Sequence, residues 1–214
     1  MPRRNLVPLA LLAVLVVLTA GFAVLGLSAA PPSGSVIVQN ATAQSLGTPT
    51  GSTGFSLELT TTVSTGSGAT GSSVHLVDYR PPDRMTVYQV TSRLTLLGQI
   101  PASSISCVVN SYSAITAGTT PWKATGSAYS RTESLADFSA RVPNGNTCAP
   151  QPSAAHGHVL EKAVVRSGYL IALRTTVVIP PQTLLGGAPA TSGTQSETLV
   201  FLQINGTATR KLIS

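Results

Sequence analysis

The feature that most constrains this chain is a long run of uncharged residues at its N-terminus. After Arg3 and Arg4, residues 5–30 contain no charged residue, and most of them are Leu, Val and Ala. As a helix, residues 6–27 would be about 33 Å long, close to the thickness of the hydrocarbon core of a bilayer. Residues 1–30 are therefore predicted to be a signal or transmembrane anchor.

The sequence leaves open whether this segment is removed. A cleavable signal peptide needs small residues one and three positions before the cut. Cleavage after Ala30 would place Pro31 directly beyond the cut, where a proline hinders peptidases. Cleavage after Ala29 would instead place Leu27 at a position that prefers a small residue. An uncleaved anchor is therefore favoured, with secretion as the alternative.

The arginines before the run predict its orientation. Arg3 and Arg4 favour the cytoplasmic side, so the long C-terminal part is expected to lie outside the cytoplasm. The predicted location is the cell membrane, crossed once. In an exported domain Cys107 and Cys148, the two cysteines of the chain, are expected to form a disulfide.

Charge argues against one class of partner. The chain has 13 basic and 7 acidic residues, so without Arg3 and Arg4 there are 11 against 7, a formal charge of +4. The basic residues from Arg80 to Lys211 lack the clustered, aromatic-interleaved pattern of nucleic-acid binding. We therefore expect no nucleic-acid partner.

The remaining chain divides by composition. Residues 31–54 are rich in Pro, Gly, Ser, Thr, Ala and Gln and are expected to be mostly a flexible tether, in which the apolar residues 36–38 could begin a short strand or helix. Residues 55–214 are expected to form an extracytoplasmic β-rich domain. It begins at Phe55, where apolar and polar residues start to alternate with the period of a half-buried strand.

Further strands are expected along this domain. They fall at residues 74–79, 85–93, 94–100, 104–112, 159–166, 169–179 and 197–204. Residues 132–142 break the alternation and are expected to form one short helix, capped by Ser130 or Thr132. The predicted fold class is mainly β (α+β): an antiparallel curved sheet, a half barrel or sandwich with one short helix, preceded by an N-terminal membrane helix.

No constellation for catalysis or metal binding stands out. His156 and His158 would point the same way on a strand, but zinc needs three or four ligands, and Glu161 and His75 are the other candidates. His75 and Asp78 lie on opposite faces of one expected strand, and no Gly-x-Ser-x-Gly motif accompanies them. We therefore expect no enzyme, no cofactor and no metal.

Two asparagines begin an Asn-x-Thr pattern. Asn40 and Asn205 are therefore glycosylation acceptors if the host modifies exported proteins. For Asn205, a turn formed with Gly206 explains the sequence equally well.

Aromatic residues suggest a place for a ligand. Tyr79, Tyr88, Phe138 and Tyr169 fall at expected strand or helix positions from which they could line an apolar cavity. A cavity of this kind would suit an acyl chain. Packing in an ordinary core is the alternative.

The order of the segments resembles a known family. An export segment, a polar linker and a strand pair joined by the corner VDYRPPDR at residues 77–84 resemble the exported carriers of the LolA and LprG kind. Those carriers fold as a strongly curved antiparallel sheet closed by helices and hold lipids or acyl chains against its concave face. The resemblance implies a half barrel with a lipid ligand.

We therefore expect a non-enzymatic envelope protein, anchored in the membrane or secreted, that binds a lipid or another apolar ligand. The first alternative is an extracytoplasmic interaction module that presents an edge or loop to an envelope protein partner. The second alternative is an exported hydrolase.

Overall fold

The structure is a computed structural model and describes residues 32–47, 53–143, 148–150, 156–180 and 192–212. The chain divides into a unit Met1–Pro32 and a compact unit Ser33–Ser214, and every element below belongs to the second. The predicted signal or anchor, residues 1–30, lies outside the described residues. Within the described ranges, no helix has the length and apolar character needed to cross a membrane.

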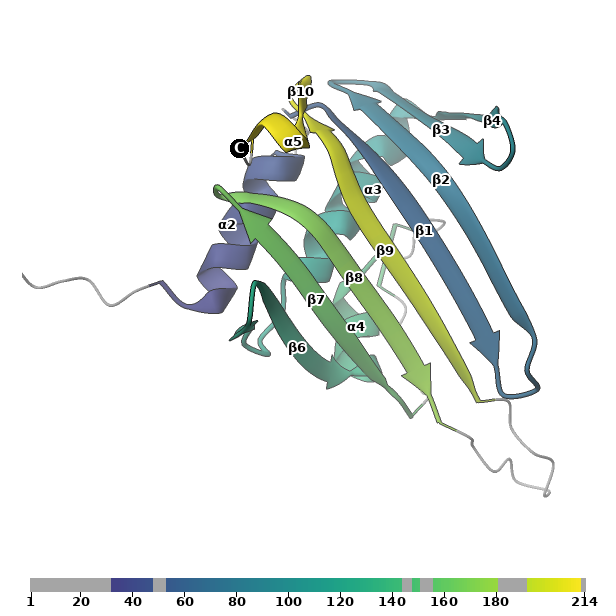
Figure 1. The fold of residues 1–214 in the computed structure, drawn as a ribbon, viewed down its shortest axis with the longest axis vertical. Helices are drawn as coiled ribbons and strands as arrows, with labels where there is room; N and C mark the ends of the chain where they lie inside the picture. Colours follow the sequence, from purple (N-terminus) through teal and green to yellow (C-terminus); the bar gives the residue numbers. More distant parts are fainter. Residues whose placement is uncertain (1–31, 48–52, 144–147, 151–155, 181–191, 213–214) are drawn as a thin grey trace, which may run out of the picture. The chain divides into compact units, whose positions relative to one another are not determined.

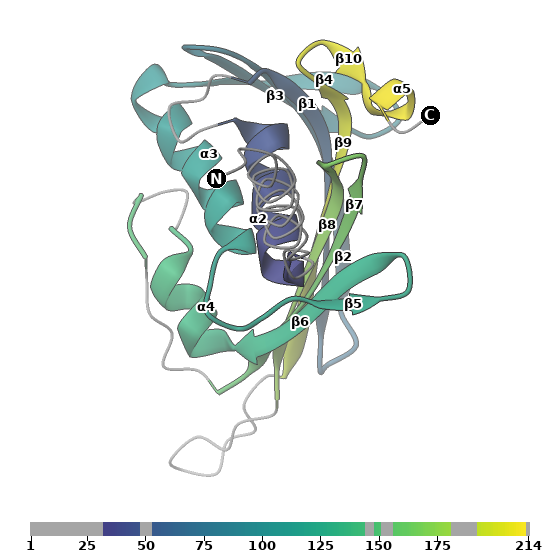
Figure 2. The same ribbon diagram turned by 90° about the vertical axis from the view of Figure 1, so that its left-hand side faces the viewer.

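The described strands form one antiparallel sheet in the order β4-β3-β2-β1-β9-β8-β7-β6-β5, with β10 beside β9 (Figure 1). The strands are β1 (Phe55–Thr65), β2 (Thr70–Arg80), β3 (Arg84–Val90), β4 (Leu94–Ile100), β5 (Lys123–Thr125), β6 (Ala128–Ser134), β7 (His158–Arg166), β8 (Tyr169–Ile179), β9 (Gly193–Ile204) and β10 (Thr207–Ala208). Strands β1 to β4 and strands β5 to β9 each lie in the sheet in their sequence order, and the two runs meet where β1 pairs with β9. The sheet is curved (Figure 2), which confirms the prediction of a mainly antiparallel curved sheet.

The concave face of the sheet carries the core. In β1, Phe55 and Leu57 are buried, whereas Ser56 and Glu58, which alternate with them, lie on the convex face. The buried partners on neighbouring strands are Val77, Tyr79, Met85, Leu173, Leu199 and Phe201. Each fully buried large side chain contributes about 1.5–3 kcal/mol relative to exposure.

Four helices occur among the described residues, where the sequence predicted one. They are α2 (Gly34–Leu46), α3 (Ala102–Thr116), α4 (Leu135–Arg141) and α5 (Thr209–Leu212). The α2 and α3 helices lie side by side over the concave face (Figure 2). The expectation of a single short helix is therefore wrong.

Helix α2 corrects the expectation of a tether over Gly34–Leu46. Its buried residues are Val38, Ala41, Thr42, Ser45 and Leu46, which recur at the spacing of one helix face. The Ser45 hydroxyl donates to the carbonyl of Leu170 and accepts from its N–H, at 3.1 and 2.9 Å. Most of this buried stripe is small or hydroxylated, so the sequence shows no apolar period there.

Helix α3 replaces the strand expected at residues 104–112. Ile105, Cys107 and Val109 are two residues apart, as on one face of a strand, although Val108 is also apolar. The same segment also repeats at helical spacing, because Ile105, Val109 and Ile115 are buried and Tyr112 packs against the core. The sequence therefore fits both the strand period and the helix period, and packing against the sheet selects the helix.

The helix expected at residues 132–142 is confirmed in part, because α4 begins only at Leu135. The residues before it continue β6, whose register with β7 runs to Ser134. The Ser134 hydroxyl caps the helix by accepting from the Asp137 N–H at 3.1 Å. The expected caps, Ser130 and Thr132, lie inside the strand.

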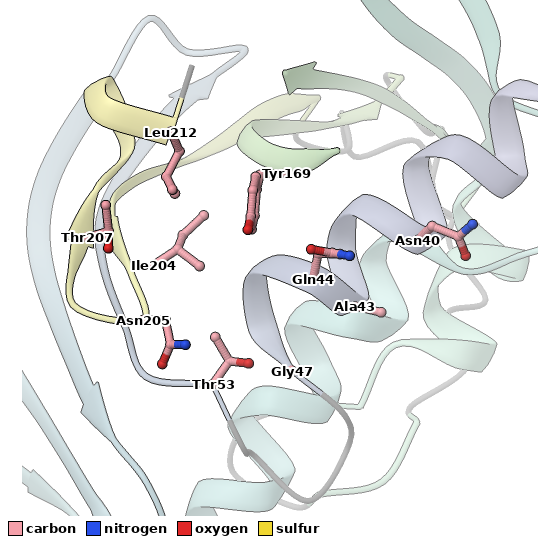
Figure 3. A pocket seen from close by; sticks show the side chains of 10 residues that line it. All are labelled: Asn40, Ala43, Gln44, Gly47, Thr53, Tyr169, Ile204, Asn205, Thr207 and Leu212. Atoms are coloured by element: carbon pink, nitrogen blue, oxygen red, sulfur yellow. The ribbon is translucent and has the colours of Figure 1, made fainter. Parts of the chain in front are cut away.

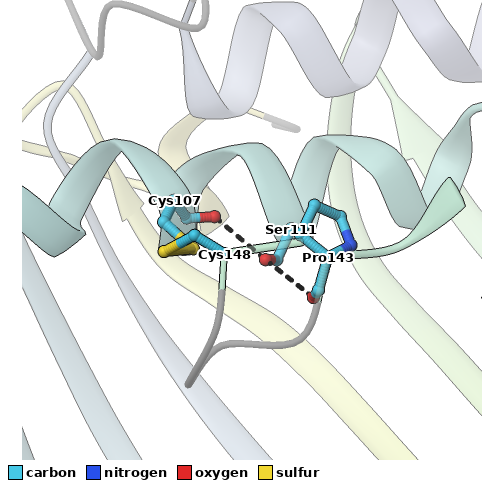
Figure 4. The surroundings of a disulfide bond; sticks show 4 residues. All are labelled: Cys107, Ser111, Pro143 and Cys148. Atoms are coloured by element: carbon cyan, nitrogen blue, oxygen red, sulfur yellow. Dashed lines mark hydrogen bonds between the residues drawn. A yellow bond between two sulfur atoms is a disulfide. The ribbon is translucent and has the colours of Figure 1, made fainter. Parts of the chain in front are cut away.

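Cys107 and Cys148 form the expected disulfide (Figure 4). It ties α3 to the segment after α4. Beside it, the Ser111 hydroxyl lies 2.9 Å from the Cys107 carbonyl and 3.1 Å from the Pro143 carbonyl. Pro143 in turn pairs with Pro150, so two links hold this segment against α3.

Candidate functional site

A cavity of about 710 Å³ lies at the end of the sheet where β8 begins and β9 ends (Figure 3). Helix α2, the start of β8, the β9–β10 turn and α5 form its walls. The lining residues are Asn40, Ala43, Gln44, Gly47, Thr53, Tyr169, Ile204, Asn205, Thr207 and Leu212. Its volume falls in the usual range for small-molecule sites.

A glycine shapes the α2 side of the cavity. Gly47 ends the helix with φ +81°, and its N–H donates to the Ala43 carbonyl at 2.8 Å. A Cβ at this position would lie 2.8 Å from the Thr53 nitrogen, which is closer than real Cβ atoms come. Only glycine lets these two segments meet at the wall.

A tight turn shapes the opposite side. Asn205 and Gly206 both have positive φ, 52° and 75°, as a two-residue hairpin turn requires. The Asn205 N–H donates to the Gly54 carbonyl at 2.7 Å, which fixes the turn beside the start of β1. The Asn205 side chain lines the cavity opposite α2 (Figure 3).

The described lining of the cavity is uncharged and combines amide with apolar side chains. Among the described residues that line it, none is a carboxylate, a cation, a histidine or a cysteine. Asn40, Gln44 and Asn205 supply amides that both donate and accept hydrogen bonds. Ile204 is 2% exposed and belongs to the core, and Leu212 packs against that core. One wall is therefore apolar and continuous with the interior.

The structure scatters the four aromatic residues predicted to line a ligand. Tyr169 lines this cavity. Tyr79 lies in the core with its ring centroid 5.2 Å from that of Phe55. Phe138, on α4, packs against the same core. Tyr88 pairs with Leu76, a register that places both on the convex face. Of the four, Tyr169 alone reaches the cavity.

The candidates for metal binding and hydrolysis do not converge. His158 is exposed on the convex face, whereas Glu161 is buried on the concave face. Asp78 accepts from the Arg80 Nε at 3.1 Å, and His75 points to the other side of β2. Across the part of the chain that the structure describes, no group of three His, Cys, Asp or Glu could hold a metal.

A buried cluster of four charges lies at the opposite end of the helices. Arg131 pairs with Glu161, and Arg141 pairs with Glu133 at 2.8 Å through its Nη1. Arg131 Nη2 also donates to the Ile115 carbonyl at 2.7 Å, one of the free carbonyls at the C-terminus of α3. The cluster therefore fastens the end of α3 to β6 and β7.

Burial has its largest effect in this cluster on the pKa of the Glu161 carboxyl. It raises the pKa of Glu161 to about 7, against the lowering effect of Arg131, and the neighbouring Glu133 raises it further. Arg131 also stacks over the Trp122 ring, 4.5 Å from its centroid. Arg131, Glu133 and Arg141 lie within eleven residues, but Glu161 comes 20 residues later on another strand, so no local sequence pattern predicted the cluster.

The sequence analysis missed most of the cavity. Asn40 and Gln44 lie in the segment that was expected to be a tether, and Thr207 follows the turn. The available signal was Ser33, which caps α2 by accepting from the Val36 N–H at 3.4 Å. The two asparagines of the glycosylation patterns both line the cavity, although their sequence pattern suggested no ligand.

Comparison with solved structures gives weak likenesses. The chain is similar to lipovitellin, in a structure titled for its lipid–protein interactions, with a TM-score of 0.34, 7% identity, and coverage of 72% of this chain. It spans a quarter (25%) of the lipovitellin chain.

A LolA superfamily protein from Nitrosomonas europaea is also similar, with a TM-score of 0.26 and 8% identity, covering 86% of this chain and 98% of that one. This is the kind of protein that the sequence resembles. No protein-family model and no curated protein matches the sequence. Because the structural likenesses are weak, the function proposed below rests on the residues of this chain.

Proposed function

We propose that this domain is a non-enzymatic binding protein that holds an uncharged amphiphile, such as a neutral lipid with a hydroxylated head, outside the cytoplasm. The observation that carries the proposal is the cavity itself. It combines an apolar wall that continues into the core with a rim of amides and no charge.

The two kinds of lining divide the ligand between them. An alkyl segment against Ile204 and Leu212 would gain about 0.8 kcal/mol for each buried CH₂ group. Hydroxyl groups at the other end would bond to the amides of Asn40, Gln44 and Asn205. A charged head would lose its hydration there and find no counterion, so the cavity favours a neutral one.

A cavity-filling variant tests this function. The full chain is incubated with a photoactivatable monoacylglycerol, irradiated, and the adduct is quantified. Ala43 is exposed on α2 and lines the cavity, so Ala43→Phe fills the space without disturbing the core. We expect labelling to fall at least fivefold.

The matched control is Ala136→Phe on α4, at an exposed alanine that does not line the cavity. It is expected to label like the unmodified chain. Equal labelling of Ala43→Phe and the unmodified chain would contradict the proposed function.

One observation favours a second function, the contact of an envelope protein at the edge of the sheet. Edge strand β4 exposes Leu94, Leu96 and Leu97 by 57%, 60% and 53%. Exposed apolar residues on an unpaired edge are typical of interaction surfaces. If β4 contacts a partner, Leu96→Lys should abolish its stoichiometric co-purification while leaving monoacylglycerol labelling unchanged.

A further inference from the structure

A polar group of residues interrupts the apolar concave face away from the cavity. Glu197 lies in β9 two residues before the buried Leu199, and Thr175 lies in β8 two residues after the buried Leu173. The two are direct cross-strand partners and both face the helices. Burial, and after it the charge of the Glu197 carboxylate, raise the pKa of the Tyr112 hydroxyl on α3.

This group lacks the partners that buried polar atoms normally have. Thr175 is 7% exposed, and its Oγ1 has no hydrogen-bond partner among the residues that the structure describes. The Glu197 carboxylate, half-buried, forms no ion pair or hydrogen bond with any residue in the described ranges. Burial raises the pKa of Glu197. A buried polar group without a partner destabilises the fold, so native proteins seldom keep one without a purpose.

The surrounding charges do not supply the missing partner. On the far side of Thr175, its other cross-strand neighbour is Glu161, which Arg131 already pairs. In the buried cluster there, both arginines are already paired with Glu133 and Glu161. On its other side Glu197 faces Thr61, which is uncharged.

We propose that Glu197 and Thr175 form a binding site for the positively charged amine of a ligand. An ammonium group has three N–H donors. The Glu197 carboxylate would act as its counterion and accept a hydrogen bond, and the hydroxyl oxygen of Thr175, its cross-strand partner, would accept another. This site takes a cation, whereas the cavity takes an uncharged ligand, and it does not depend on the function proposed for the cavity.

Three short probes with the same alkyl chain test the site: hexylammonium, hexanol and hexyl sulfate. The full chain is held in a non-ionic detergent, and the fluorescence of Trp122, its one tryptophan and 3% exposed, follows thermal unfolding. Hexylammonium is expected to raise the unfolding temperature and to bind at least tenfold more tightly than hexanol. Hexyl sulfate is expected to have no effect.

Glu197→Gln keeps the shape and removes the charge, so it should abolish the preference for hexylammonium. Without ligand it should unfold at a higher temperature than the unmodified chain, which also shows that it folds. Thr175→Val should weaken hexylammonium binding severalfold. The control, Glu58→Gln, changes a half-buried glutamate on the convex face of β1 and should leave binding unchanged.

Equal binding of hexylammonium and hexanol, or equal responses of Glu197→Gln and the unmodified chain, would overturn the proposal. Neither result would affect the labelling of the cavity by a neutral monoacylglycerol. The failure of this site and the failure of the proposed function are therefore distinguishable.

Discussion

At the scale of single residues, Arg131 is the side chain on which the stability of the fold depends most. Its guanidinium group is fully buried, pairs with Glu161, and donates to carbonyls at the end of α3. Removing one member of a buried ion pair leaves the other charge without compensation. The exposed pair of Arg80 and Asp78 has the same chemistry in water, where it is worth little.

We predict that Arg131→Met lowers the free energy of unfolding by about 3–5 kcal/mol. Arg80→Met should change it by less than about 1 kcal/mol. Urea unfolding of both variants, followed by far-UV circular dichroism, measures the difference. Similar losses for the two variants would show that the buried cluster does not fasten α3.

The raised pKa of the Glu161 carboxyl predicts how the free energy of unfolding depends on pH. The pKa of its carboxyl is about 7 in the folded protein and 4.5 ordinarily, so from about pH 4.5 to about 7 the unfolded chain releases a proton that the folded protein keeps. Rising pH therefore favours unfolding, by at most about 1.4 kcal/mol per pH unit for one proton. The raised pKa of Glu197 acts in the same direction.

The free energy of unfolding should thus fall from pH 4.5 to pH 7 and level off above it. Urea unfolding at intervals of half a pH unit measures this slope, and Glu161→Gln should reduce it. A stability that rises through the same window would contradict the protonation assigned to Glu161.

At the scale of elements, the sequence predicted strands better than helices. Alternation identified β1, β8 and the meander from β2 to β4, because one face of each is apolar and the other polar. It failed at α2, whose buried stripe is mostly Ala, Thr and Ser, and at α3, whose sequence fits both periods. The cavity was missed with α2, since no local pattern showed that this segment folds back onto the sheet.

Substitutions in α2 test whether residues 34–46 form a packed helix or a tether. Leu46 is 1% exposed, so Leu46→Ala should cost about 2–5 kcal/mol of stability. Val36, on the same helix, is 45% exposed, and Val36→Ala should cost less than about 0.5 kcal/mol. Urea unfolding followed by Trp122 fluorescence separates the two. Equal small effects would mean that residues 34–46 are a tether after all.

The disulfide is the other link between elements. Cys107 and Cys148 are 41 residues apart, and closing a loop of that length stabilises by about 4 kcal/mol on the chain-entropy model. Cys148→Ser and the double variant with Cys107→Ser should therefore lose similar stability, about 2–4 kcal/mol, in urea unfolding without reductant. Additive losses would show that the cysteines act separately.

At the scale of the whole domain, the curved sheet keeps two polar features apart. The uncharged cavity lies where β8 begins, whereas Glu197 and the buried ion cluster lie farther along the same concave face. Between them the core packs α2 and α3 against the sheet. Under the proposed function, a neutral amphiphile would enter at one end of the domain without unpacking its interior.

The most direct test of this account is to find where an uncharged lipid binds. Cells producing the full chain are fed a photoactivatable, alkyne-tagged monoacylglycerol and irradiated, and tandem mass spectrometry then locates the adduct in the purified protein. The account predicts adducts on α2 at residues 40–47 and on the β9–α5 segment at residues 204–212. Adducts confined to residues 5–30, or spread over the convex face, would contradict it.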